Sequence, residues 1–289
     1  MSNKTKGILY IILSAFSFSL MSLFIRLSGD IPTLQKSFFR NVVAALVAFA
    51  ILRKKKIPLR CPKEARLSVI GRAVFGTLGI FFNFYAIDHL NIADASMLNK
   101  LSPFFAILFS FFILKESIAG YQIACVSTAL AGALFILKPE GTQLISFPAM
   151  IGLMGGMSAG LAYTLLRRAT SQGVAGSFVV FFFSLFSCIC SLPYCILYFT
   201  PMSTTQLFFL LMTGVAAAFG QFFITAAYTC APARELSVYD YSNVIFSGLL
   251  GFLFLNQVPD YLSYIGCAII IGASIVMFVK NQQPYVKKK

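Results

Sequence analysis

Long apolar stretches separated by short polar connections run through the whole chain. Ten of them have about 20 residues, the length that a helix needs to cross the hydrocarbon core of a bilayer. Only helices and closed barrels satisfy their backbone polar groups in lipid, and continuous apolar stretches favour helices. We therefore predict an all-α integral membrane protein with ten transmembrane helices. The expected spans are 7–27, 34–52, 67–88, 92–114, 119–137, 148–166, 177–199, 205–227, 235–255 and 260–279.

The second half of the chain repeats the pattern of the first. A shift of 141 positions places Phe105, Leu108, Phe111 and Leu114 on Phe246, Leu249, Phe252 and Leu255. We expect two repeats, residues 1–140 with spans 1–5 and residues 141–289 with spans 6–10. Because each repeat has an odd number of spans, the second enters the membrane from the opposite side, which predicts an inverted repeat.

Composition and charge agree with a membrane location. The chain is 58% hydrophobic and 11% charged, with a mean hydropathy of +0.84, whereas soluble domains carry about 25% charged residues. The net charge of +14 comes mainly from loops and tails, so we attribute it to topology and not to a nucleic-acid partner. Most of the 23 basic residues lie on the side of the two termini, which predicts a multi-pass cell inner membrane protein with cytoplasmic termini.

The residues available for enzyme or metal chemistry are few. The single histidine is His89, and the seven cysteines show no CxxC spacing. We therefore expect no metal site, no disulfide, no cofactor and no catalytic residues. A membrane-embedded enzyme remains a remote alternative, because it would need an acid/base or metal constellation.

Polar residues interrupt span 4 near its middle. Asn99 and Lys100 lie inside an otherwise apolar stretch, and an ionisable side chain at that depth is a hypothesis about function by default. Pro103 removes one helical hydrogen bond, so we expect a kink there. We predict that Asn99 and Lys100 contribute to a substrate site. Lys100 in an internal ion pair that only holds the bundle together is an equal alternative.

Span 9 carries the matching polar residues of the second half. Tyr239, Asp240 and Asn243 are predicted to bind substrate, and Asp240 is the acidic residue placed deepest in a span. A buried carboxylate either titrates or pairs, and Lys100 is the available cation. By helix rise alone, however, the two residues could lie about 10 Å apart in height. Whether they pair stays open.

Four further positions complete the predicted substrate site. Gln221 begins a polar stripe with Thr225 and Tyr228 in span 8, and a stripe favours a water-filled or ligand-filled cavity. The others are Asn83 in span 3, Tyr163 in span 6 and Arg40 in span 2. Arg40 either extends to the outer interface or meets an anionic substrate, and both interpretations stay open.

Two features favour structural roles. Gly152, Gly156 and Gly160 form a doubled GxxxG in span 6, which predicts close packing against a neighbouring helix. Glu116 lies in a turn before span 5, where a carboxylate can accept hydrogen bonds from free N–H groups at a helix start.

These motifs resemble the drug/metabolite transporter superfamily, EamA type. The resemblance rests on FFRN in span 2, LSPFFAILFSFFILKES at the end of span 4 and the repeat of that block in span 9. The second half departs from the pattern, with Val244 at the position of the proline and Gln257 at that of the glutamate. The resemblance implies an integral membrane carrier of small solutes, with the transport path between the halves.

We therefore expect a secondary transporter that works by alternating access. Its predicted substrate is a small polar or zwitterionic metabolite, an amino acid or amino-acid-derived compound, because a cation and Asp240 would together suit a zwitterion. Export or facilitated diffusion is favoured. The alternative is uptake of a larger metabolite such as S-adenosylmethionine or a nucleoside-type compound. The expected partners are this solute and the lipid bilayer, and the expected state is a monomer.

Overall fold

The computed structural model describes residues 3–115, 117–137, 146–230 and 236–282, and within these ranges the regular structure is entirely helical. Nine helices there are long and apolar enough to cross a membrane, and the 17-residue α6 is a tenth apolar helix. The predicted all-α membrane fold is confirmed. Glu116 lies outside the described residues. The elements are α1 (Asn3–Leu27), α2 (Thr33–Lys54), η1 (Lys63–Ala65), α3 (Arg66–His89), α4 (Ile92–Asn99), α5 (Ser102–Leu114), α6 (Gly120–Ile136), α7 (Phe147–Ser171), α8 (Gly176–Leu197), α9 (Thr204–Cys230), η2 (Ser237–Tyr241), α11 (Ser242–Leu255) and α12 (Tyr261–Gln282).

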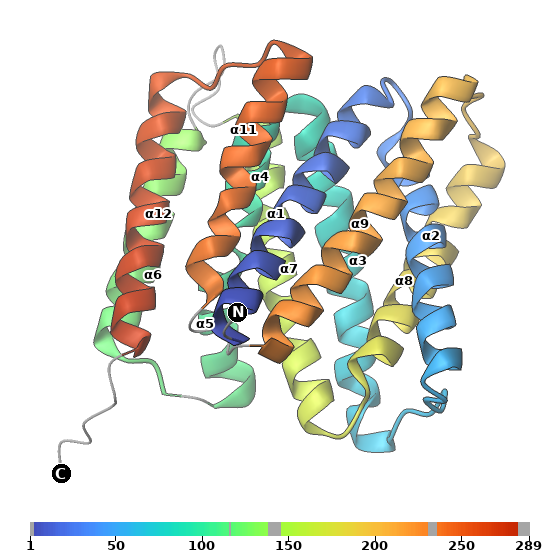
Figure 1. Cartoon of the computed structure of the whole chain (residues 1–289), viewed down its shortest axis with the longest axis horizontal. Coiled ribbons are helices and arrows are strands. Elements are labelled where there is room, and N and C mark those ends of the chain that lie inside the picture. Colours follow the sequence, from blue (N-terminus) through green and yellow to red (C-terminus); the bar gives the residue numbers. More distant parts are fainter. Residues whose placement is uncertain (1–2, 116, 138–145, 231–235, 283–289) are drawn as a thin grey trace.

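The helices form one bundle in which segments from the two halves of the chain pack against each other (Figure 1). α1 packs on α9 and α11, α3 on α7, α2 on α8 and α6 on α12. The pair α6 and α12 forms one edge of the bundle, and α2 and α8 lie toward the opposite edge (Figure 1). The broken helices α4–α5 and η2–α11 lie between these pairs, so residues at the breaks face the interior of the bundle.

Both halves break and end their fourth span at matched positions. α4 and α5 are separated at Lys100–Leu101, and η2 gives way to α11 after Tyr241, which is Lys100 shifted by 141. The final residues also match, because Lys115 and Asn256 both adopt left-handed backbone, with φ of 55° and 52°. The two halves therefore share details of backbone shape. The inverted relation of the repeats stays a prediction.

The predicted close packing of span 6 is confirmed by its glycines. A Cβ atom added at Gly156 would lie 2.4 Å from the backbone oxygen of Leu98, and one at Gly160 would lie 2.7 Å from that of Ser102. The hydrophobic effect does not drive association between helices in lipid, so such backbone contact supplies much of the packing. α7 thus supports the chain on both sides of the break at Lys100.

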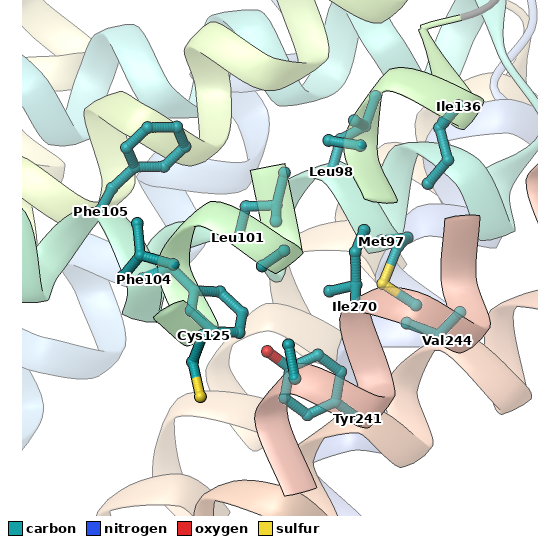
Figure 2. Close-up of a cluster of buried hydrophobic side chains, with 14 of the residues drawn as sticks. Met97, Leu98, Leu101, Phe104, Phe105, Cys125, Ile136, Tyr241, Val244 and Ile270 are labelled. Atoms are coloured by element: carbon teal, nitrogen blue, oxygen red, sulfur yellow. The ribbon is translucent and has the colours of Figure 1, made fainter. Parts of the chain in front are cut away.

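Apolar side chains fill the space beside the breaks. Leu98, Leu101 and Phe104 from α4 and α5 meet Tyr241 from η2 and Ile270 from α12 in one buried cluster (Figure 2). On the outside of the bundle, large apolar side chains such as Phe112 and Leu197 remain exposed, as expected for residues facing lipid. Buried apolar packing therefore lies beside the break.

Candidate solute site at the broken helices

Lys100 and Asp240 form an ion pair between the two broken helices. The Lys100 Nζ atom lies 2.5 Å from Asp240 Oδ2, and the two side chains are 13% and 17% exposed. The two side chains therefore touch, which helix rise alone had left open. The estimate assumed continuous helices, whereas the chain leaves the helical path at Lys100, and the four-methylene stem of lysine extends its reach further.

The ion pair does not use all the hydrogen-bonding capacity of Asp240. Its Oδ1 atom is buried and has no hydrogen-bond partner among the described residues. The Tyr241 hydroxyl lies beside the pair and donates to the backbone oxygen of Lys100 at 3.1 Å. A buried carboxylate oxygen without a partner is costly. A ligand ammonium could donate to that oxygen without displacing any described contact.

A buried polar network ties the same helices to α1. Ser96 and Ser247 lie 2.9 Å apart, and Ser247 donates to Ser19 at 3.2 Å. The Asn243 amide donates to the Ala15 backbone oxygen at 2.9 Å and to Ser19 Oγ at 2.8 Å. Asn243 therefore bridges α11 and α1 through its amide nitrogen. Its predicted role in substrate binding stays a prediction.

The structure distributes the other predicted positions over several helices. Asn99 is half-buried at the end of α4, Asn83 is half-buried on α3, and Gln221 is exposed on α9. Tyr239 is half-buried and meets Phe278 edge-on at 6.5 Å between ring centres. Their roles in binding stay predictions. The side chains of Thr225 and Tyr228, which complete the predicted stripe, lie outside the described part.

Arg40 points into the bundle. Its guanidinium carbon lies 6.0 Å from the centre of the Phe183 ring on α8, and Nη1 donates to Asn41 Oδ1 at 2.7 Å. Arg72, on α3, lies over the same ring at 4.3 Å. Sequence reasoning counted Arg72 as a basic residue near the cytoplasmic face. Gly76, one helical turn after Arg72, could have indicated this position, because a glycine leaves room for the Arg72 side chain to lie along the helix.

A second ion pair joins the ends of α2 and α3. Lys36 Nζ lies 2.6 Å from Asp88 Oδ1, and the Lys36 side chain is only 1% exposed. Arg26, at the end of α1, donates to the backbone oxygens of Ile87 and Asp88. The sequence did not predict this pair, because Lys36 was counted only as a basic residue on the outer side of the membrane, at the start of span 2. Opposite charges at adjoining ends of neighbouring spans were the available signal.

Polar contacts also link other helix ends on that side. Gln35 exchanges two hydrogen bonds with the backbone of Thr200, at 2.9 and 3.0 Å. Gln257 accepts a bond from the Ile92 backbone nitrogen at 3.0 Å. By contrast, a cavity of about 290 Å³ lies among α5, α6 and α7 and is lined in part by Ser110, Gln122 and Tyr163.

The profile of the EamA-like transporter family matches residues 5–138 and again 146–279. The chain belongs to this family, as the sequence motifs indicated. A solved crystal structure with 18% sequence identity has the same fold, with a TM-score of 0.66 over 96% of this chain and 99% of the other.

Three relatives give the class of activity. The Pseudopaline exporter CntI of Pseudomonas aeruginosa is 30% identical over 273 residues, 94% of this chain and 95% of that protein. Solute carrier family 35 member G1 of Homo sapiens is 25% identical and covers 93% of this chain and 78% of its own length. The Riboflavin transporter of Rhizobium johnstonii is 24% identical, and the match covers 99% of this chain and 95% of that protein. The chain is a multi-pass membrane transporter of a small molecule and not an enzyme.

Proposed function

We propose that this transporter exports a small amino-acid-derived metabolite from the cytoplasm by alternating access. The carrying observation is the Lys100–Asp240 ion pair at the breaks of two matched helices. In carriers built from repeats, interrupted helices near the middle of the membrane supply the solute site. The solute would carry both a carboxylate and an amine.

Such a zwitterion can replace the internal ion pair by two external ones. Its carboxylate would accept from Lys100, and its ammonium would donate to Asp240, including the oxygen that has no described partner. A buried ion pair recovers little more than its own desolvation cost, so opening it for a ligand that satisfies both charges is energetically feasible. Tyr239 and Asn99 would orient the bound solute.

Direction and topology are part of the same proposal. The relative that is 30% identical is named as an exporter, which supports outward transport. The start of α1, the end of α12 and the α2–α3 and α7–α8 connections lie at the same end of the bundle (Figure 1). The α2–α3 connection is rich in lysine and arginine, and Arg168 lies in the last turn of α7, which supports a cytoplasmic location for that end and for both termini.

Uptake of a larger, ring-containing metabolite is the second candidate. It is favoured by the similarity to proteins named as riboflavin transporters, at 24% identity. The half-buried Tyr239 beside the ion pair could stack on a ring. Flux measured separately from each side of oriented vesicles distinguishes the two candidates.

The test is solute flux into proteoliposomes from a panel of amino acids, S-adenosyl compounds, nucleosides and flavins. For any solute that is transported, we expect Asp240→Asn to lower flux at least about a hundredfold. Removing one partner of a buried charged hydrogen bond costs about 2–5 kcal/mol. Asp30→Asn is the matched control, since Asp30 is an exposed acid in the α1–α2 connection. Unchanged flux in folded Asp240→Asn protein would refute the assigned site.

A further inference from the structure

Arg40 and Arg72 converge on one aromatic ring inside the bundle. They come from neighbouring helices, α2 and α3, and their guanidinium carbons lie 6.0 and 4.3 Å from the centre of Phe183. A Cβ at Gly76 would lie only 1.9 Å from Arg72 Nη1, so this guanidinium is held between the α3 backbone and the ring. The absence of a side chain at position 76 creates that space.

The two guanidiniums lack an acidic partner. Neither takes part in an ion pair within the described part of the chain, where the pairs are Lys36–Asp88 and Lys100–Asp240. Arg40 Nε and both Nε and Nη1 of Arg72 are buried, with no hydrogen-bond partner there. Arginine remains charged in proteins, so these groups cannot avoid the cost of burial by losing a proton.

Asn41 provides a hydrogen-bond partner for Arg40 but no compensating charge. Its side-chain oxygen accepts from Arg40 Nη1 at 2.7 Å, and its nitrogen donates to Ser187 Oγ on α8 at 2.8 Å. An amide carries no net charge, so the repulsion between the two cations is not compensated. Buried charges in proteins are normally paired or bind an ion. An anion would provide the charge that the described side chains do not.

We propose that Arg40 and Arg72 bind an acidic group, a carboxylate or a phosphate, of the transported solute. Planar guanidinium groups suit both, because their N–H groups match the oxygens in pairs. Phe183 forms an apolar wall that excludes water and strengthens these bonds.

This inference rests on the proposed function and narrows the substrate class. A zwitterionic head bound by Lys100 and Asp240 leaves no role for two more cations. The solute therefore carries a further acidic group, as in a dicarboxylic amino acid or a carboxyalkylated amino acid. A neutral or cationic amino acid would leave Arg40 and Arg72 uncompensated.

The experiment measures binding of inorganic phosphate and succinate to the purified full chain by thermal shift, at constant ionic strength in chloride. An anion that binds only the folded protein raises its apparent melting temperature. We expect both probes to stabilise the native protein, and Arg72→Gln to weaken their binding at least about tenfold, the loss of one charge-assisted hydrogen bond. Arg72→Lys keeps the charge and should retain part of the binding.

Arg53→Gln is the matched control. Arg53 is also on α2 and lies 5.8 Å from the ring centre of Phe49, but it is exposed. Its substitution should leave binding unchanged. No stabilisation by either probe, or equal loss in Arg53→Gln and Arg72→Gln, would overturn the inference. A lipid occupant would also overturn the inference. In that case, phosphatidylglycerol in nanodiscs would prevent phosphate and succinate from binding, whereas phosphatidylcholine would not.

Failure of the proposed function is distinguishable from failure of this inference. Asp240→Asn should abolish flux and leave phosphate binding intact, because its carboxylate belongs to the other part of the site. If Asp240→Asn lowers flux but Arg72→Gln leaves phosphate binding unchanged, the proposed function stands and the anion site is rejected.

Discussion

The two Lys–Asp pairs of this transporter have nearly the same length and very different surroundings. Lys36–Asp88 measures 2.6 Å and joins the ends of intact helices. Arg26 binds the adjoining backbone oxygens, and Lys36 is almost completely buried. Lys100–Asp240 measures 2.5 Å, lies at helix breaks and leaves one carboxylate oxygen without a described partner.

This difference separates structural from functional use of the same chemistry. The first pair is surrounded by contacts that hold three helix ends together, so it acts as a tie between α1, α2 and α3. The second pair is held by backbone that is already interrupted, and it retains capacity for a ligand. Distance alone does not separate the two pairs, and our proposal of a solute site rests on the unsatisfied oxygen of Asp240 at an interrupted helix.

The largest loss of stability that tests this comparison is expected at the Lys36–Asp88 pair. Lys36→Met should destabilise the protein by about 3–5 kcal/mol, because it leaves the Asp88 carboxylate buried without its cation. The measurement is chemical unfolding in detergent, followed by circular dichroism.

The double variant Lys36→Met/Asp88→Leu is the control for that prediction. Removing both charges should recover most of the lost stability, since two apolar side chains often replace a buried pair without a net cost. A double variant that is less stable than Lys36→Met would contradict the interpretation of the pair as a simple tie.

A smaller effect should sharpen the account of the central break. Gly156→Ala should lower the free energy of unfolding by about 1–3 kcal/mol, because the new methyl group would press on the backbone oxygen of Leu98. Leu98 lies just before the break at Lys100–Leu101. Gly272→Ala on α12 is the control, as nothing lies within 4 Å of its added Cβ. Equal melting temperatures for the two variants would show that α7 does not support the break.

The smallest expected loss of stability concerns the hydrogen bond between the Ser96 and Ser247 hydroxyls. Ser96→Ala removes a bond of 2.9 Å between α4 and α11 and should cost about 0.6 kcal/mol, the typical value for interhelical bonds in membranes. Ser191→Ala removes only a bond within its own helix and should change stability less. A larger loss for Ser191→Ala than for Ser96→Ala would contradict the assignment.

The spans were predictable because they depend on local sequence, and so was an interruption of span 4, although the helix breaks at Lys100–Leu101 and Pro103 lies in the first turn of α5. Apolar length determines the helices, and proline lacks the hydrogen bond that would continue span 4. The break before Ser242 was not predictable in this way, since Val244 stands at the proline position. There, contacts such as the bond from Asn243 to α1 accompany the change from 3₁₀ to α-helix.

The candidate site was predictable in part for the same reason. Charged residues inside spans are rare, so Lys100, Asp240 and Arg40 could be found by their positions alone. The contact between Lys100 and Asp240, and the position of Arg72 over Phe183, depend on side chains from distant segments. The first depends on the position of the α4–α5 break beside η2, and the second on the packing of α3 against α8, neither of which a one-dimensional pattern contains.

The left-handed residues Lys115 and Asn256 show how the two halves have diverged. Glycine adopts this backbone conformation without strain, asparagine does so with modest cost, and lysine with more. Neither half has glycine there, yet both keep the turn at the same place. The two halves thus keep the same backbone shape with different side chains, and one half supplies the cation and the other the carboxylate of the central pair.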